Sequence, residues 1–342
     1  MKGSGSDLAT IKADQFTGLK LDEVLPLMER DSMSDEDMVS YLAACQLRPD
    51  MPRGSIETLL HAFVPYPHVN HTHPDAVNMI CCSEGGENHA RECYGEAVWI
   101  PYIWPGFTLS RQVGEAVRNN PQARFLLLAK HGLVTWGDTH EESYNRTIGA
   151  INRAAEYVAK RGGDQPFGGQ GLEPLAPDER EALLAEVLPA LREALSGGAP
   201  KILRPDTSEG VLGFDCGRDA ELFQVGAACP DHLVRTKARP LWVDFDPKSE
   251  DADALVSKLH DRLEKYREDY EAYFGRHEEA DEEMFDPSPR LVLIPGVGLV
   301  AAVANLKEAD LSRDFYHRAI TVMRGRTRSA VSSPSRRKSY TL

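Results

Sequence analysis

Two histidines, His71 and His73, stand two residues apart in the segment 68–77, which reads HVNHTHPDAV. Alternate residues of a β-strand point to the same face, so on a strand both imidazoles project into one space. On a helix the same pair would diverge by about 200°. A strand-borne His-x-His supplies half of a zinc site, which for catalysis needs three protein ligands and an open position. Taken alone, the pair is better explained as two half-buried histidines on an edge strand.

A third histidine, His131, lies at a predicted strand–turn–strand junction. The segment 123–139, ARFLLLAKHGLVTWGDT, reads as an apolar strand, the turn Lys130-His131-Gly132 and a second strand. Gly132 permits a close approach of the backbone. His131 is therefore the natural candidate for a third ligand.

A carboxylate precedes the histidine strand. Ser55 predicts a helix N-cap, and Glu57 then falls in the first turn of a helix whose apolar face carries Leu59, Leu60 and Phe63. An acidic residue at this position ordinarily compensates the helix dipole. Because the helix leads directly into the histidine strand, it can also place Glu57 beside the imidazoles.

Composition limits the class of protein. With 342 residues and 42% hydrophobic content, the chain has room for two domains with real cores. A net charge of −14 argues against a nucleic-acid binder. The six cysteines form no C-x-x-C pair, which is typical of a reducing cytoplasm. No apolar run approaches the roughly 20 residues that span a bilayer, and no signal-peptide core is present, so we expect a cytoplasmic protein without a membrane partner.

The pattern of helices and Gly-rich segments predicts the domain organisation. Gly-rich residues 162–171 mark a boundary. The predicted parts are a metal-binding domain over 1–162, a linker and helix over 163–200, a second α/β domain over 201–323 and a basic, disordered tail over 324–342. Helical patterns are predicted over 21–28, 35–45, 109–119, 139–160, 177–195 and 249–276, the last one lying on the surface.

The second half of the chain echoes the first. The run HLVRTKARPLWV from His232 resembles HVNHTHPDAVNM, and LVLIPGVGLV from Leu291 resembles LLLAKHGLV. A degenerate repeat would carry the fold without the metal. It predicts three equivalences: Arg235 with His71, Lys237 with His73, and Val297 with His131.

These motifs together resemble the class II aldolase/adducin family, most closely the aldolase half of bifunctional rhamnulose-1-phosphate aldolase/alcohol dehydrogenases. The resemblance rests on GSIETLLHAF, HVNHTHPDAV, the IPY of 100–102 and KHGLVTWG, and continues through PDHLVRTK, LIPGVGL and DFYHRAI. It covers most of residues 1–324. It implies a three-layer α/β/α domain with a predominantly antiparallel sheet, followed by a second α/β region.

The resemblance also implies roles for individual residues. The zinc ligands, which would also suit another divalent metal, correspond to His71, His73 and His131. Glu57 corresponds to the carboxylate that coordinates zinc or acts as general base. The segments that bind substrate phosphate correspond to Ser4 and Gly5, with Gly54 and Ser55. Related aldolases take a proton-donor tyrosine from a neighbouring subunit, for which Tyr94 is a loose candidate here.

The sequence departs from the family's pattern at both ends. A strand and a Gly-Asn-x-Ser-type turn that helps to bind phosphate precede the KGSG of residues 2–5 in the family, and this chain begins after them. We therefore expect an aldolase site that lacks part of its phosphate pocket. No G-x-G-x-x-G occurs in the sequence, so we expect neither NAD nor a short-chain dehydrogenase half.

The function implied by the resemblance is zinc-dependent cleavage of a ketose 1-phosphate such as L-rhamnulose 1-phosphate. The products would be dihydroxyacetone phosphate and L-lactaldehyde. Two alternatives stay open: a pentulose-phosphate 4-epimerase on the same scaffold, and a truncated, non-catalytic remnant that still binds metal. The family resemblance further implies a homo-oligomer, with a tetramer favoured.

Overall fold

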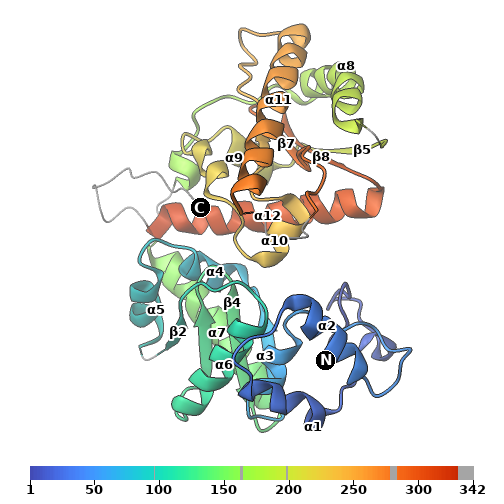
Figure 1. Cartoon of the computed structure of the whole chain (residues 1–342). Helices are drawn as coiled ribbons and strands as arrows, with labels where there is room; N and C mark the ends of the chain where they lie inside the picture. Colours follow the sequence, from blue (N-terminus) through green and yellow to red (C-terminus); the bar gives the residue numbers. More distant parts are fainter. Residues whose placement is uncertain (96, 162–164, 198, 278–282, 330–342) are drawn as a thin grey trace. The chain divides into compact units, whose positions relative to one another are not determined.

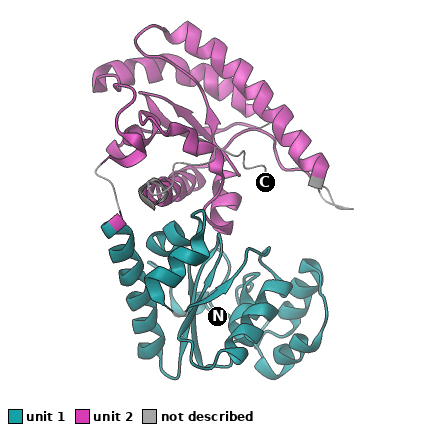
Figure 2. Cartoon of the chain, turned by 90° about the vertical axis from the view of Figure 1, so that its left-hand side faces the viewer, with its two compact units in different colours: residues 1–160 teal, residues 161–342 magenta. Residues whose placement is uncertain are grey.

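The computed structural model describes residues 1–95, 97–161, 165–197, 199–277 and 283–329. The chain folds as two compact units, Met1–Lys160 and Arg161–Leu342 (Figure 2). Each unit is built around one four-stranded mixed sheet with helices on both faces (Figure 1). The predicted α/β class, with a predominantly antiparallel sheet, is confirmed.

In the first unit the strand order is β1-β4-β3-β2. The strands are β1 (His68–Thr72), β2 (Val98–Ile100), β3 (Phe125–Leu128) and β4 (Gly132–Gly137). β4 pairs antiparallel with both β1 and β3, and β2 joins β3 in parallel. Since β1 and the β3–β4 turn adjoin at one end of the sheet, this pairing brings His71 close to His131.

Helices cover both faces of this sheet and make the three layers. On one face, Leu127 and Leu133 pack with residues of α4 (Asp75–Cys81), α5 (Gly86–Tyr94) and α7 (His140–Arg161). On the other face, Leu126 and Trp136 pack with α3 (Thr58–Phe63) and α6 (Phe107–Asn119). Alternate residues of β3 therefore face opposite cores, as the period of a strand requires.

A small helical subdomain precedes these elements and packs on α3. It contains η1 (Ala13–Gln15), α1 (Leu21–Val24), η2 (Leu25–Glu29) and α2 (Asp35–Ala44). The helix predicted over 21–28 is in fact one α-helical turn followed by a 3₁₀ segment, because Pro26 has no N–H to continue the α-helical ladder. Ser34 caps α2 as predicted, and its Oγ accepts from the N–H of Asp37 at 3.1 Å.

The second unit repeats this architecture with the order β5-β8-β7-β6. Its strands are β5 (Ile202–Asp206), β6 (Leu241–Trp242), β7 (Leu291–Ile294) and β8 (Gly298–Val303). α8 (Pro177–Ser196) and α11 (Ala252–His277) cover one face. α9 (Glu209–Asp215) and α12 (Leu306–Ser329) cover the other. Three short elements complete the described fold: η3 (Pro166–Gly168), η4 (Ala220–Val225) and α10 (Pro230–Thr236).

The charged helix predicted over 249–276 is largely α11. The prediction that it lies on the surface is correct for one face of the helix and wrong for the other. Leu255, Leu259 and Leu263 recur every four residues and are 1 to 3% exposed in the core. The helix is therefore amphipathic: this stripe anchors it to the sheet, and only the opposite face is solvated.

Strand order and strand direction support the repeat, because the two sheets match pair by pair. In the hairpins, Leu128 pairs with Gly132 and Ile294 with Gly298, so Val297 does occupy the position of His131. The other two equivalences are wrong. The counterpart of β1 is β5, in which Asp206 pairs with Leu299 as Thr72 pairs with Leu133.

The register therefore places Pro205 and Thr207 where the first unit has His71 and His73. Arg235 belongs to α10 and Lys237 is its C-cap, so neither residue lies on a strand. HLVRTK is therefore similar to the histidine strand in sequence but is not structurally equivalent to it. Pro, Thr and Val at the three positions give the second unit the fold without those ligands.

The predicted disordered tail begins too early. Residues 324–329 continue helix α12, and the remainder of the tail lies outside the described residues. Within the described parts of the chain, no helix is long and apolar enough to cross a membrane.

An ion-paired aspartate joins the second sheet to α12. Asp206 Oδ2 lies 2.7 Å from His317 Nε2, and the Asp206 side chain is only 9% exposed. Burial by itself would raise the pKa of Asp206, but the hydrogen bonds from His317 and Ser208 outweigh it and hold the pKa well below its usual range. The contribution to stability is therefore present above about pH 4 and is lost as the pH falls below that value.

We expect Asp206→Asn to lower the free energy of unfolding by roughly 1–3 kcal/mol at pH 7. The deficit should shrink as the pH falls from about 4 towards 2, because the carboxyl of the unfolded wild-type chain takes up a proton in this range while the native carboxyl is still ionised. Urea unfolding of both proteins across this range measures it. A deficit that stays constant in acid would contradict the ionic role of Asp206.

Candidate metal centre

Glu57 is positioned by a turn rather than by the helix itself. α3 starts at Thr58, so Glu57 is the N-cap and Ser55 is not, contrary to the sequence prediction. Ser55 instead organises the turn: its Oγ accepts from the N–H of Glu57 at 3.2 Å, and its carbonyl accepts from the hydroxyl of Thr58 at 2.6 Å. The turn directly precedes α3, and it holds the Glu57 carboxylate at the edge of the sheet.

The three histidines come from two adjacent backbone segments. His71 pairs with Val134 across β1 and β4, and His73 follows directly after the end of β1. His131 lies in the turn between β3 and β4, where Lys130 adopts a left-handed backbone conformation with φ of 53°. The β1–β4 pairing thus fixes all three imidazoles against one end of the sheet.

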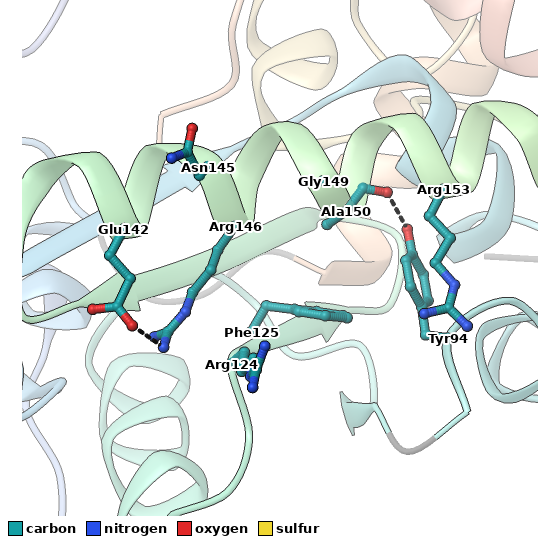
Figure 3. A pocket seen from close by; sticks show the side chains of 9 residues that line it. All are labelled: Tyr94, Arg124, Phe125, Glu142, Asn145, Arg146, Gly149, Ala150 and Arg153. Atoms are coloured by element: carbon teal, nitrogen blue, oxygen red, sulfur yellow. Dashed lines mark hydrogen bonds and ion pairs between the residues drawn. The ribbon is translucent and has the colours of Figure 1, made fainter.

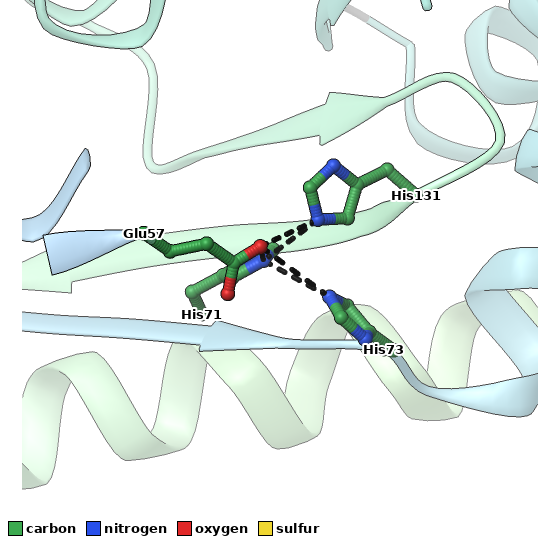
Figure 4. Close-up of side chains that lie close together, drawn as sticks. All are labelled: Glu57, His71, His73 and His131. Atoms are coloured by element: carbon green, nitrogen blue, oxygen red, sulfur yellow. Dashed lines mark hydrogen bonds and ion pairs between the residues drawn. The ribbon is translucent and has the colours of Figure 1, made fainter. Parts of the chain in front are cut away.

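The four side chains converge on one point (Figure 4). His71 Nε2 lies 3.1 Å from His73 Nε2 and 3.2 Å from His131 Nε2. Glu57 Oε1 lies 2.8 Å from His131 Nε2, 3.1 Å from His71 Nε2 and 4.0 Å from His73 Nε2. The side chains of His71 and His131 are 3% and 1% exposed, whereas Glu57 and His73 keep 20% and 16%. Solvent therefore reaches the cluster along Glu57 and His73.

This arrangement fits a divalent metal ion. Nitrogen ligands bind zinc at about 2.0–2.1 Å, which in a tetrahedral site puts them roughly 3.3 Å from one another. The separations of 3.1 and 3.2 Å between ring nitrogens are close to that spacing. Three imidazoles and one carboxylate are also a donor set that zinc accepts. The cluster can therefore hold a metal, as its ligand atoms all lie within 4.8 Å of one another.

The pKa shifts of Glu57 and His131 favour the protonation states that bind a cation. Burial alone would raise the pKa of the Glu57 carboxyl, but the charge of His71 and hydrogen bonds from His131 and His71 hold it well below its usual range. Burial lowers the pKa of His131 to about 4, against the opposing hydrogen bond to Glu57. At neutral pH the site therefore offers an ionised carboxylate beside a neutral imidazole of His131, and both forms bind metals.

Backbone contacts orient the ligands, and sequence reasoning missed them. His71 Nδ1 donates to the carbonyl of Leu133 at 3.0 Å, so in the neutral ring the proton sits on Nδ1 and the Nε2 lone pair faces the site. His61, one turn after Glu57 on α3, donates to the carbonyl of Val69 at 3.2 Å, and its ring lies 6.5 Å from that of His71. The Glu-x-x-x-His spacing was the available signal for His61. The carbonyls of Leu133 and Val69 have no sequence signal, because every residue carries a backbone carbonyl.

The four residues predicted to bind phosphate form two adjoining segments. Gly3 makes an antiparallel bridge to Gly54, and the N–H of Ser4 donates to the carbonyl of Arg53 at 2.8 Å. Gly5 follows in a left-handed turn with φ of 77°. Ser55 connects these segments to the metal cluster, because it contacts Glu57 directly. The fold thus brings Ser4 and Gly5 beside Gly54 and Ser55 near Glu57.

Tyr94 is not brought to this cluster. Its hydroxyl donates to the carbonyl of Ala150 at 2.9 Å, and the residue is 8% exposed in the core between α5 and α7. Burial raises the pKa of the Tyr94 hydroxyl above its usual range. The Tyr94 hydroxyl is thus committed to a hydrogen bond in the core of the first unit, and it is not among the groups that the fold brings to the metal cluster of its own chain.

We expect Tyr94→Phe to leave metal binding and turnover unchanged and to lower the free energy of unfolding by about 1 kcal/mol, the usual contribution of one hydrogen bond. Denaturant unfolding beside a metal assay measures both. The exposed Tyr144, on α7, gives a matched control in Tyr144→Phe, which should change neither. A variant of normal stability that has lost more than about nine-tenths of its turnover would restore Tyr94 as a candidate donor.

Two family models match the two halves of the chain. Residues 1–158 match the family model for the class II aldolase and adducin N-terminal domain, and residues 182–332 match the model for the second domain of class II aldolase. The chain belongs to the class II aldolase and adducin family.

Two known proteins show the extent of the similarity. The chain is 47% identical over 330 residues to the uncharacterized oxidoreductase YuxG of Bacillus subtilis (strain 168). The match covers 96% of this chain but 48% of that protein, so the chain spans about half the length of this relative. The N-terminal class II aldolase domain of a conserved protein from Thermoplasma acidophilum is 40% identical, over 46% of this chain and 73% of that one, with a TM-score of 0.44.

Proposed function

We propose that the chain is a divalent-metal-dependent aldolase, with zinc as the metal, that cleaves a ketose 1-phosphate such as L-rhamnulose 1-phosphate. The products are dihydroxyacetone phosphate and an aldehyde, which is L-lactaldehyde for that substrate. The observation that carries the proposal is the convergence of Glu57 with three imidazoles at one end of the first sheet. Membership of the class II aldolase family agrees with it.

Each residue of the cluster has a part in this reaction. His71, His73 and His131 would hold the metal, and a divalent ion held there would supply a Lewis acid for the negative charge that develops on the substrate's carbonyl oxygen. The ionised carboxylate of Glu57 takes the proton from the C4 hydroxyl of the ketose. The C3–C4 bond then breaks and C4 becomes the aldehyde. The electron pair left at C3 takes the proton from the Glu57 carboxylic acid, which completes dihydroxyacetone phosphate and restores the carboxylate.

The phosphate group of the substrate has a proposed place beside the cluster. Ser4 and Gly5 supply a turn, and Gly54 with Ser55 supply the neighbouring segment. Hydroxyl and backbone N–H groups of such turns bind anions. Because Ser55 contacts Glu57, a phosphate held there keeps the rest of a small sugar within reach of the carboxylate.

The test is a direct assay of the purified, zinc-loaded chain with L-rhamnulose 1-phosphate. We expect equal amounts of dihydroxyacetone phosphate and aldehyde, with activity lost on chelation and restored by zinc. A pentulose 5-phosphate assayed in parallel by NMR separates cleavage from 4-epimerisation. Epimerisation without cleavage, or no product from any ketose 1-phosphate by metal-loaded protein, would overturn the proposal.

A further inference from the structure

A second site lies at the other end of the first sheet, between the start of β3 and one side of α7 (Figure 3). The cavity has a volume of about 570 Å³, within the usual range for small-molecule pockets. Three arginines, one carboxylate and two aromatic rings line it: Arg124, Arg146, Arg153, Glu142, Phe125 and Tyr94. None of these residues belongs to the metal cluster.

The pocket carries an excess of positive charge. Glu142 forms an ion pair with Arg146, which leaves the charges of Arg124 and Arg153. Neither of these two guanidinium groups forms an ion pair with a carboxylate of the described residues. Two guanidinium groups without a carboxylate partner among the described residues favour an anionic ligand in this pocket.

Contacts within the first unit hold part of the pocket wall in place. Arg146 also donates to the carbonyl of Trp136 at 2.6 Å, which ties it to the end of β4. The guanidinium of Arg153 stands 5.9 Å from the ring centre of Tyr94. That ring is fixed in turn by the hydrogen bond to Ala150 and by an edge contact with Phe125 at 5.1 Å. A preorganised pocket loses less entropy on binding.

We propose that this pocket binds the phosphate group of a small phosphorylated metabolite, at a site separate from the metal centre. Guanidinium groups match phosphate oxygens in pairs, and a phosphate dianion balances the two free charges of Arg124 and Arg153. The four residues of β3 separate the pocket from the turn that carries His131, a distance of roughly 10 Å along the strand. The site is thus available while a substrate occupies the metal centre.

The test measures binding of glucose 6-phosphate by calorimetry, with glucose as the neutral comparison and inorganic phosphate as the minimal probe. His73→Ala protein serves as background, because it carries the pocket without an intact metal site. We expect saturable binding of both phosphates and none of glucose. Arg124→Ala with Arg153→Ala should weaken binding about tenfold or more. Lys160→Ala removes an exposed charge from the same helix and should change nothing.

Two results would overturn the proposal that this pocket binds phosphate. One is phosphate affinity that the double arginine variant leaves unchanged, since the anion would then sit elsewhere, for example beside Ser4 and Ser55. The other is a wild type that binds no phosphate together with a double arginine variant whose sedimentation coefficient differs from that of the wild type. That outcome would make the pocket a contact between copies of the chain. Both arginines are exposed, so the variants should retain the wild-type circular dichroism.

Discussion

Replacing Glu57 with glutamine should lower kcat for retro-aldol cleavage by roughly 10²–10⁴, the usual contribution of a positioned general base. Glutamine keeps the shape of the side chain beside His71 and His131 but cannot accept the proton of the substrate hydroxyl. The three imidazoles remain, so the metal should stay bound with reduced affinity. Steady-state kinetics with zinc in excess, together with the zinc content of the variant, separate loss of the base from loss of the metal.

Glu115→Gln is the matched control, because it removes a half-exposed carboxylate of α6 that pairs only with Arg111 among the described residues. Its kcat should equal that of the wild type. If Glu57→Gln keeps more than about a tenth of the wild-type kcat while it holds zinc, Glu57 is not the base, and its place in the reaction must be reassigned.

Gly132→Ala should combine a large loss of stability with damage to the metal centre. A Cβ at this position would lie 2.5 Å from the carbonyl oxygen of Thr72 and 2.8 Å from Cδ2 of His73. Neither neighbour can retreat without breaking the β1–β4 pairing or moving a ligand. We expect a cost of roughly 1–3 kcal/mol in the free energy of unfolding, and a metal affinity about 10–100-fold weaker.

Gly149→Ala gives the contrasting control. Its Cβ would meet nothing within 4 Å on α7, so alanine should stabilise the helix by about 1 kcal/mol. Urea unfolding and a competitive zinc chelator measure the two quantities for both variants. A Gly132→Ala protein with the stability and zinc affinity of the wild type would show that the close approach at this turn is not needed.

Much of the metal cluster could be predicted from sequence, because local rules place its parts. The two-residue spacing of His71 and His73 turns both rings to the same side, although β1 ends at Thr72, one residue before His73. Gly132 marks a turn where a backbone passes close by. The start of α3 was misplaced, since Ser55 can cap a helix or build a turn, and only the surrounding contacts decide between them. The hydrogen bond from His71 to the Leu133 carbonyl depends on the register of β1 and β4, and no side chain in the sequence indicates that register.

Other features depend on packing that the sequence does not display. The repeat was recognised from HLVRTK, yet the true counterpart of the histidine strand is β5, which shares little with it beyond the strand pairing. No local pattern indicates that the Tyr94 hydroxyl donates to the carbonyl of Ala150, because this contact depends on how α5 packs against α7. The arginine pocket collects residues 94, 124 and 153 from three separate elements, so no local motif could reveal it.

The most direct test of the metal centre is the zinc content of the purified chain, measured by mass spectrometry after reloading and removal of loose metal, with His73→Ala in parallel. His73 is a partly exposed member of the cluster, so its removal should leave the fold intact. The account predicts one zinc ion per wild-type chain and little or none in the folded variant. A wild type that cannot be loaded, or a variant that binds zinc as tightly, would contradict it.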